Sequence, residues 1–426
     1  MAIGYGLSAY TDTDILAPTM QQTRPAGVAR YFGFSAYWFG FSFHWFLLLP
    51  LLMPADVLRF VGQEQQGTYL GWLAGTLALI PLLLPPFLGI WSDRLGKRLP
   101  FMVWGTAINV LGLGVMFFAP DYWVYAGGYV LVQLGNSVAS APYAALIPDL
   151  VPAHEKGAAS GAMGFFQLSS QIAGGVAAFA LGGSREGQYL AIILVLVVCT
   201  FITLRSVREP RVKRDAEPLD LRVFFRPQYA GFRWVFLTRA LVESGRYAIQ
   251  PFLLFYLKDV VQQFRIGPVV LPSADLALAA LLVLLSLTAA LTAITSGPYS
   301  DRVGKKPVIY FAGAVMGVAA LGFALTQNFA VAALAALVFG LGYGAYVSVD
   351  WAMATSVLPD ASKHARDMGV WHVALVFPQL FQGVFGQILD AGNRANPNGG
   401  YPVLFAVAVT FFVLGTVFIS RVRGVR

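Results

Sequence analysis

The chain has few charged residues and a single cysteine, and each scarcity excludes a class of protein. Charged residues make up 12% of the 426 residues and hydrophobic residues 57%, whereas roughly a quarter of a soluble domain is charged. Because Cys199 is alone, an intramolecular disulfide and a multi-cysteine metal site are excluded. The first 30 residues lack the basic start and short apolar core of a cleavable signal peptide, so none is expected. The composition therefore indicates an integral membrane protein.

Chemical motifs are also missing. No nucleophile–base pair, phosphate-binding loop or metal-ligand cluster is present, so we expect no enzyme, no catalytic residue, no bound metal and no cofactor. The formal net charge of +8 does not indicate nucleic-acid binding, because the basic residues cluster in loops between apolar runs.

Twelve apolar segments are long enough to cross a bilayer as helices, which takes about 20 residues each. Helices are expected because lipid cannot satisfy backbone polar groups, and the alternation typical of a barrel is missing. The predicted spans are 31–53, 68–91, 100–119, 122–147, 157–182, 188–205, 233–257, 270–297, 307–326, 329–357, 366–389 and 401–420.

The basic residues predict the orientation. With both termini inside, five of the 29 Lys and Arg fall outside and two lie within a span, which leaves 22 on the cytoplasmic side. This asymmetry predicts a multi-pass protein of the cytoplasmic (inner) membrane with both termini in the cytoplasm. The predicted organisation is a tail 1–30, a six-helix bundle 31–205, a solvated linker 206–232 that touches the anionic leaflet, a second bundle 233–420 and a tail 421–426.

A ten-residue loop occurs twice in the chain, 208 residues apart. Its marked residues are Gly89, Asp93, Arg94, Gly96, Lys97 and Arg98 in the first copy, and Gly297, Asp301, Arg302, Gly304, Lys305 and Lys306 in the second. Gln171 and Gln379 share the same offset. Duplicated membrane bundles of this kind are typical of secondary transporters, whose substrate site lies between the halves.

The repeated loop resembles the signature that the major facilitator superfamily carries after its second and eighth helices. The resemblance implies an all-α membrane protein of twelve transmembrane helices in two pseudo-symmetric six-helix bundles, which opens alternately to each side. It also implies a conformational gate, in which Asp93 and Asp301 meet a neighbouring helix N-terminus; the alternative is that the loops only fix topology. Gly89 and Gly297 are expected to allow close helix approach, and Gly96 and Gly304 a tight turn.

Other stretches resemble bacterial glycoside:cation symporters related to sucrose transporters. They include the surroundings of Asp149, of Asp350 and of Arg366-Asp367, and we add Asp149, Arg366 and Asp367 to the gate. The sodium-binding acidic cluster of melibiose-type carriers is missing, because the first two predicted spans contain no Asp or Glu. The fifth span also lacks the Gly-Pro-x-x-Gly-Gly pattern of drug:proton antiporters, which weakens an export function.

The seventh span carries Arg239, Glu243, Arg246 and Gln250, whose spacing places them on one helical face. Ionisable groups inside a span are costly and usually face a cavity or a partner. We predict that Glu243 couples transport to protons by alternating between an arginine and a proton or substrate. The alternative is a permanently paired structural triad. The net positive cluster favours an anionic or hydroxyl-rich ligand.

Spans one, four, seven and ten line the cavity in the family that the chain resembles. His44 and Asp350 join Glu243 as proton-coupling candidates; equally, His44 is a packing residue and Asp350 the partner of a basic residue in the gate. The remaining cavity candidates are Tyr37, Phe41, Gln133, Asn136, Gln167, Gln171, Tyr343, Tyr346, Trp371, His372 and Gln379.

These observations predict a proton-coupled importer of a sugar or glycoside. The partners would be a small-molecule substrate and the lipid bilayer, the driving force a proton gradient in preference to a sodium gradient, and the functional unit a monomer. Two alternatives stay open: export of an amphipathic compound or lipid, suggested by the 33 Phe, and a membrane receptor that transports nothing.

Overall fold

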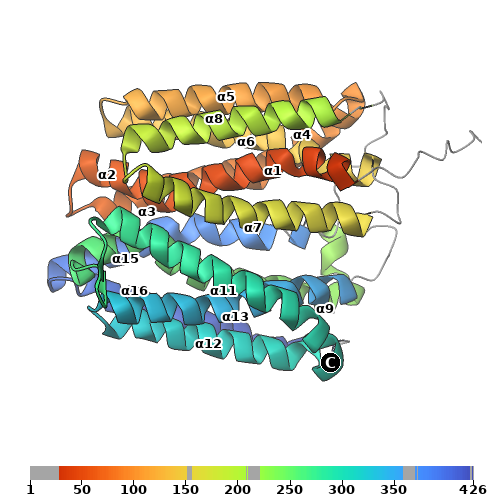
Figure 1. The fold of residues 1–426 in the computed structure, drawn as a ribbon. Helices are drawn as coiled ribbons and strands as arrows, with labels where there is room; N and C mark the ends of the chain where they lie inside the picture. Colours follow the sequence, from red (N-terminus) through yellow and green to blue (C-terminus); the bar gives the residue numbers. More distant parts are fainter. Residues whose placement is uncertain are drawn as a thin grey trace, which may run out of the picture.

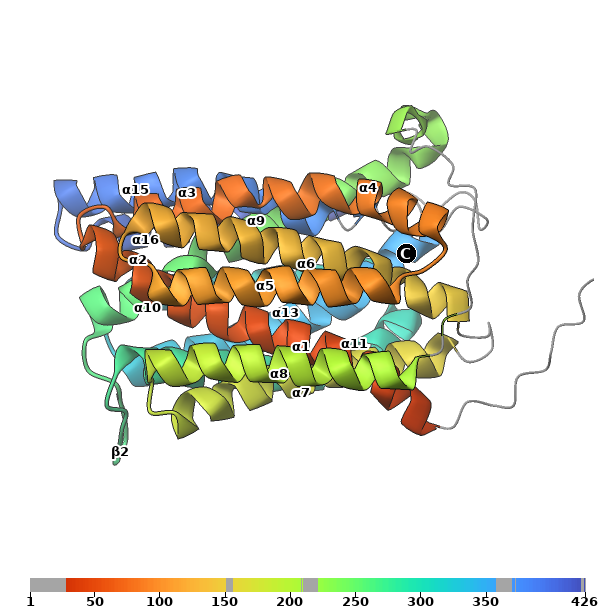
Figure 2. The same cartoon turned by 90° about the horizontal axis from the view of Figure 1, so that it is seen from above.

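The computed structural model describes residues 28–150, 156–207, 209, 221–357, 370–371, 373–422 and 425. Within these ranges long helices run side by side, with the first half of the sequence in the upper part of Figure 1 and the second half in the lower part. The start of α1 and the C-terminal end lie at the same end of the bundle in both views (Figures 1 and 2). We call this end the predicted cytoplasmic end and the opposite one the predicted outer end.

The first half contains helices of very different lengths. They are α1 (Val28–Leu47), the π-helical η1 (Leu48–Leu52), α2 (Met53–Val61), α3 (Gln66–Leu77), α4 (Leu79–Leu95), α5 (Leu99–Phe118), α6 (Tyr122–Leu150), α7 (Lys156–Ala180) and α8 (Arg185–Ser206).

The second half repeats this plan and adds one hairpin. Its elements are η3 (Leu221–Phe225), η4 (Pro227–Tyr229), α9 (Ala230–Ile249), η5 (Gln250–Phe252), α10 (Leu253–Tyr256), η6 (Leu257–Val261), β1 (Arg265–Ile266), β2 (Val269–Val270), α11 (Ala274–Val303), α12 (Lys305–Leu325), α13 (Phe329–Ser356), η8 (Phe377–Phe381), α15 (Gln382–Ala395), α16 (Gly400–Phe418) and η9 (Ile419–Arg421). The strands pair antiparallel.

Among the described residues, nine helical segments are long and apolar enough to cross a membrane. The all-helical architecture predicted from the sequence is confirmed for these residues, apart from the short hairpin. The count of twelve spans and the orientation in the membrane stay predictions.

The first span is longer than the sequence predicted. The prediction that the first two spans contain no Asp or Glu is therefore wrong. The helical path continues through η1 and α2 to Val61, because Pro54 lies in the first turn of α2, where a missing N–H is tolerated. Asp56 therefore lies inside the first apolar segment, Phe32–Val61. The charge is paired: Arg185 Nε donates to Asp56 Oδ1 at 2.6 Å, and Tyr189 Oη donates to Oδ2 at 2.8 Å. This acid holds α2 and α8 together within one half.

Glycines bring the two halves together at the predicted outer end, where α3 packs against α15. Gly67, Gly71 and Gly75 recur every fourth residue and so form one stripe on α3. A Cβ on Gly71 would lie 2.2 Å from the backbone oxygen of Gln382, and one on Gly386 would lie 1.9 Å from that of Gly67. The backbones touch directly, as they do where small residues mediate helix packing in membranes.

Hydrogen bonds reinforce this contact. The N–H groups of Gly67 and Thr68, at the start of α3, donate to the carboxylate of Asp390 at 3.1 and 2.7 Å. Gln66 Nε2 donates to Asp259 Oδ2 at 3.0 Å, from the first half to the end of η6. An acidic side chain at a helix N-terminus is favourable, because it meets unpaired N–H groups and the positive end of the dipole.

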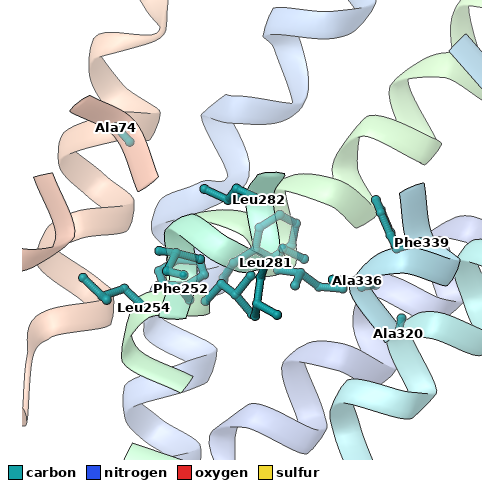
Figure 3. Close-up of a cluster of buried hydrophobic side chains, with 14 of the residues drawn as sticks. Ala74, Phe252, Leu254, Leu281, Leu282, Ala320, Ala336 and Phe339 are labelled. Carbon is teal, nitrogen blue, oxygen red and sulfur yellow. The ribbon is translucent and has the colours of Figure 1, made fainter. Parts of the chain in front are cut away.

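A buried apolar cluster also joins the halves. Ala74 of α3 belongs to the same cluster as Phe252, Leu254, Leu281 and Leu282 of the second half. Figure 3 shows these residues with Ala336 and Phe339 of α13 and Ala320 of α12. The described halves therefore share one core beside the α3–α15 contact.

Replacing Gly71 by leucine should hold the predicted outer end open, because the new side chain cannot fit against the backbone of Gln382. We expect a buried cysteine introduced at Leu389, in a Cys199→Ser background, to react with a membrane-impermeant maleimide at least about tenfold faster, which corresponds to a shift of about 1.4 kcal/mol. Gly114→Leu is the control, since no atom lies within 4 Å of a Cβ there. Equal rates in the two variants would contradict this role.

Candidate functional site

Two arginines and two acids of the second half form one buried and one partly buried ion pair, which we call the tetrad: Arg239, Glu243, Arg246 and Asp350. Arg239 of α9 pairs with Asp350 of α13, and both side chains are buried. Arg246 Nε donates to Glu243 Oε2 at 2.7 Å, one turn along α9, and Arg246 also donates to Gln250. The helical spacing of α9 thus places its charges as the sequence predicted.

The charge of the tetrad is balanced, which corrects the expectation of a net positive cluster. Each arginine has its own carboxylate, and among the described residues Arg246 is the partner of Glu243. Asp350 pairs with a basic residue, Arg239, as one of the two predicted alternatives had it, whereas its place in the gate stays a prediction. A neutral site does not attract an anionic ligand over an uncharged one.

Aromatic rings complete the walls around the arginines. The guanidinium carbon of Arg239 lies 3.7 Å from the centre of the Trp371 ring, and Trp371 packs edge-on against Trp351 at 4.9 Å. Arg246 lies 4.1 Å from the ring centre of Tyr247 and 5.7 Å from that of Tyr343. Such contacts stabilise a cation most where water is excluded.

Several buried polar atoms at the tetrad have no hydrogen-bond partner among the described residues. They are Glu243 Oε1, Arg239 Nε, Tyr346 Oη and Trp371 Nε1. Because buried polar groups are nearly always paired in native proteins, unpaired ones need an explanation such as a proton, water or ligand that binds there. Among the described residues, the tetrad and its aromatic neighbours therefore offer one acceptor, Glu243 Oε1, and three donors, Arg239 Nε, Tyr346 Oη and Trp371 Nε1, without a partner.

Amides extend the site toward the boundary of the halves. Gln379 Nε2 of η8 donates to Tyr247 Oη at 2.7 Å, and Ser286 Oγ of α11 donates to Gln171 Oε1 of α7 at 2.6 Å across the halves. Gln133 Nε2 donates to Tyr129 Oη at 2.9 Å on α6. The amides are thus held by neighbours whose bonds a ligand would have to replace.

The aromatic residues of α1 pack within the first half. The ring of Tyr37 lies 4.7 Å from that of Tyr143, and Trp38 stacks on Phe41 at 5.0 Å. Tyr143 Oη donates to the carbonyl of Phe34. Tyr37 is therefore a packing residue, whereas Phe41 and Trp38 are only half-buried.

His44 is fully buried beside Trp45, and neither ring nitrogen has a hydrogen-bond partner among the described residues. Asn136 accepts a hydrogen bond from Asn109 Nδ2 at 2.7 Å, which joins α5 to α6, so its oxygen serves helix packing. Gln167 is exposed. His372 lies outside the described residues.

The gate residues are only partly described. Arg98 Nη1 donates to Ser92 Oγ at 2.9 Å, and the backbone N–H groups of Arg98 and Leu99 donate to Glu209, which caps α5. Lys305 donates to Ser356, which joins α12 to α13. Asp301 and Arg302 are exposed, as are Arg94 and Lys97, and Lys306 is half-buried. Arg366 and Asp367 lie outside the described residues, as do the side chains of Asp93 and Asp149.

The glycines of the repeated loop give a mixed result. Gly96 and Gly304 have positive φ angles of 65° and 101°, so the predicted turns are confirmed. A Cβ on Gly89 would meet no described atom within 4 Å, so the described residues show no close helix approach there and the expectation stays a prediction. At Gly297 a neighbouring helix does come near, since a Cβ there would lie 3.2 Å from Ser348 Oγ of α13.

Sequence patterns missed several residues of the site. Tyr247 follows Arg246 and lies off the face that the spacing defines, Tyr129 is one turn before Gln133, and Ser286 is a lone serine in an apolar run. Only the repeated polar positions of spans four, five and eleven hinted at their partners. Contacts between distant helices, which no local spacing encodes, brought them into the site.

Known proteins share this sequence pattern and this fold. The profile of the Major Facilitator Superfamily matches residues 31–381, and a further match covers 277–424. The multi-drug resistance efflux pump PmrA of Streptococcus pneumoniae is 25% identical over 81% of this chain and 84% of its own length. The sucrose transport protein SUC3 of Arabidopsis thaliana is 24% identical over 41% of this chain and 37% of its own. Among solved structures, the nucleoside transporter NupG aligns with a TM-score of 0.71 at 13% identity, over 92% of this chain and 99% of that one.

Removing one member of the Arg239–Asp350 pair should destabilise the protein more than removing both. Asp350→Asn leaves a buried guanidinium without its counter-charge, at a cost of about 3–5 kcal/mol. We expect thermal unfolding in detergent to show a lower melting temperature for Asp350→Asn, and partial recovery when Arg239→Gln is added. Additive losses in the double variant would mean that the two side chains do not stabilise each other.

Proposed function

The chain belongs to the Major Facilitator Superfamily, and on that premise we propose that it is a proton-coupled secondary transporter of an uncharged substrate. The observation that carries this proposal is the balanced tetrad, in which the buried Arg239 and the partly buried Arg246 are each paired with one buried acid. A charged substrate would leave the site with a net charge in a medium of low dielectric constant, whereas an uncharged one would not.

Protons act on the acids of the tetrad. When Glu243 takes up a proton, Arg246 loses its counter-charge and its charge-assisted hydrogen bond at 2.7 Å. The arginine must then find another acceptor, either on a ligand or on a helix that has moved. Because Oε1 of Glu243 has no partner among the described residues, this carboxylate has a free position for the proton. Asp350 of α13 is a second such acid, because a proton on it would remove the counter-charge of Arg239.

The contacts between the halves support alternating access. The described hydrogen bonds between halves join α3 to η6 and α15, and α7 to α11. The first three lie at the predicted outer end, so opening that end requires breaking the glycine contact and the bonds to Asp259 and Asp390. The arrangement agrees with a carrier that is closed on its predicted outer side.

The leading substrate class is a sugar or glycoside taken up by the cell. Aromatic rings at the tetrad suit the apolar face of a pyranose, and the free donors and acceptor at Glu243, Tyr346 and Trp371 suit hydroxyl groups. The likeness to a sucrose transport protein supports this class.

Export of an amphipathic compound is the second candidate, and a specific observation favours it. The efflux pump PmrA aligns over 81% of this chain, whereas SUC3 aligns over 41%. Rings such as Phe41, Trp38 and Trp45 are half-buried on α1 and suit a large apolar ligand. The direction of transport separates the two functions.

Replacing Glu243 by glutamine should abolish transport against a gradient and spare exchange. The amide keeps the size and a hydrogen-bonding oxygen, but it cannot carry a proton. We expect proteoliposomes to lose accumulation driven by an imposed pH gradient while counterflow of labelled substrate continues. Glu64→Gln, at an exposed position, is the matched control. Undiminished accumulation by the Glu243 variant would remove this residue from coupling.

A ligand panel tests the substrate class. Mono- and disaccharides, glycosides, nucleosides, sugar acids and amphipathic drugs are added to the purified protein, and thermal unfolding is followed. A true ligand at 100 times its dissociation constant stabilises the folded state by about 2.7 kcal/mol. We expect stabilisation by uncharged compounds and none by sugar acids; a sugar acid as the best ligand would contradict the neutral site. A hit only among amphipaths would favour export.

A further inference from the structure

The hairpin between η6 and α11 exposes apolar side chains at its tip. Ile266, Val269 and Val270 are 41%, 59% and 65% exposed, and Gly267 and Pro268 form the turn between the strands. Figure 2 shows the hairpin, labelled β2, running sideways past the flank of the helices at the end opposite the C-terminus. Ile266 and Val269 pair across the ladder and so form one exposed apolar face at the tip, a candidate interaction surface.

The residue just before β1 indicates the depth of the hairpin relative to the candidate membrane spans. The ring of Phe264, just before β1, is 5.8 Å from that of Phe329, the first residue of α13. On either side of Phe329 along the chain, Leu325 is 85% exposed and Val331 46% exposed. These side chains belong to the apolar outer face of two candidate spans, Lys305–Leu325 and Phe329–Ala354, and such a face meets lipid. Phe329 itself is buried and is the first residue of the second of these spans, so the hairpin starts at the depth where the apolar part of α13 begins.

The backbone of the hairpin is already paired, so contact with lipid leaves few polar groups unsatisfied. Arg265 pairs with Val270 and Ile266 with Val269, Leu271 N–H donates to the carbonyl of Phe264 at 2.9 Å, and Arg265 Nε donates to the carbonyl of Gly267 at 2.8 Å. Pro268 has no N–H to satisfy. The exposed guanidinium of Arg265 suits the phosphates of lipid headgroups.

We propose that this hairpin is a membrane anchor, whose apolar tip inserts into the interface of the leaflet at the predicted outer end. The occupant of its surface is lipid, because the hairpin runs sideways from the bundle at the depth where the span Phe329–Ala354 begins (Figure 2). Three residues from Phe264 to the turn reach about 10 Å at about 3.3 Å each, which spans the headgroup region from the edge of the bundle. The anchor holds the junction of η6 and α11 at a constant depth while the helices tilt.

Spin labelling in nanodiscs that hold one copy of the full chain tests this proposal. A nitroxide is attached to Val269→Cys in a Cys199→Ser background, and its collisions with oxygen, which partitions into lipid, and with a water-soluble nickel chelate are compared. Ile266→Cys is a second labelling site in case the first variant does not fold. The control is Glu64→Cys, an exposed position in the turn between α2 and α3 at the same end.

We expect the label at position 269 to collide more with oxygen than with the nickel chelate, and the label at position 64 to show the opposite order. Greater access of the nickel chelate at both positions would overturn the anchor, because the tip would then lie in water. A label at 269 that is shielded from both reagents would also overturn it, because protein and not lipid would then cover the tip.

Discussion

A charge buried inside a membrane protein needs a counter-charge or hydrogen-bonding partners, and the described core of each half is organised around that constraint. The first half meets it once, with Arg185 against Asp56. The second half meets it twice, in a tetrad whose arginines also lie against the rings of Trp371 and Tyr247. Breaking a buried pair leaves an uncompensated charge, so the pairing determines how α9 lies against α13. The same dependence makes the tetrad responsive, because one proton on either acid removes a counter-charge.

The site and the contact between the halves lie on the same two helical segments. One runs through α9, η5, α10 and η6 and carries Glu243 in its first part and Asp259 at its far end. The other runs through η8 and α15 and carries Gln379 near the site and Asp390 at the outer contact. A shift of either segment caused by a change of charge at the site therefore reaches the bonds that hold α3. At the glycines the backbones touch directly, so even a small separation of α3 from α15 loses the packing between them. The contact is therefore either closed or lost.

Local spacing placed Arg239, Glu243 and Arg246 on one face of α9, but it left open which arginine Glu243 pairs with, and the structure shows Arg246. The spacing predicted the wrong net charge, because Asp350 is 111 residues from Arg239 and no periodicity joins them. Gly89 stood out by its place in a repeated loop, yet Gly71, which has no repeated partner, makes the closer contact. The first span continues to Val61 and not only to residue 53, because Pro54 lies in the first turn of α2, where a missing N–H is tolerated.

The sequence by itself determined the membrane class, the helical architecture, the duplicated plan and the family, because hydropathy, spacing and a repeated motif are local properties of the chain. Only the tertiary structure decided which acid neutralises which arginine, which glycines touch, and which amides are already held by neighbours. Those outcomes depend on distances between helices far apart in the chain. In a low-dielectric interior, a few ångströms separate a paired charge from an unpaired one, so the chemistry of the site is a property of the packed bundle.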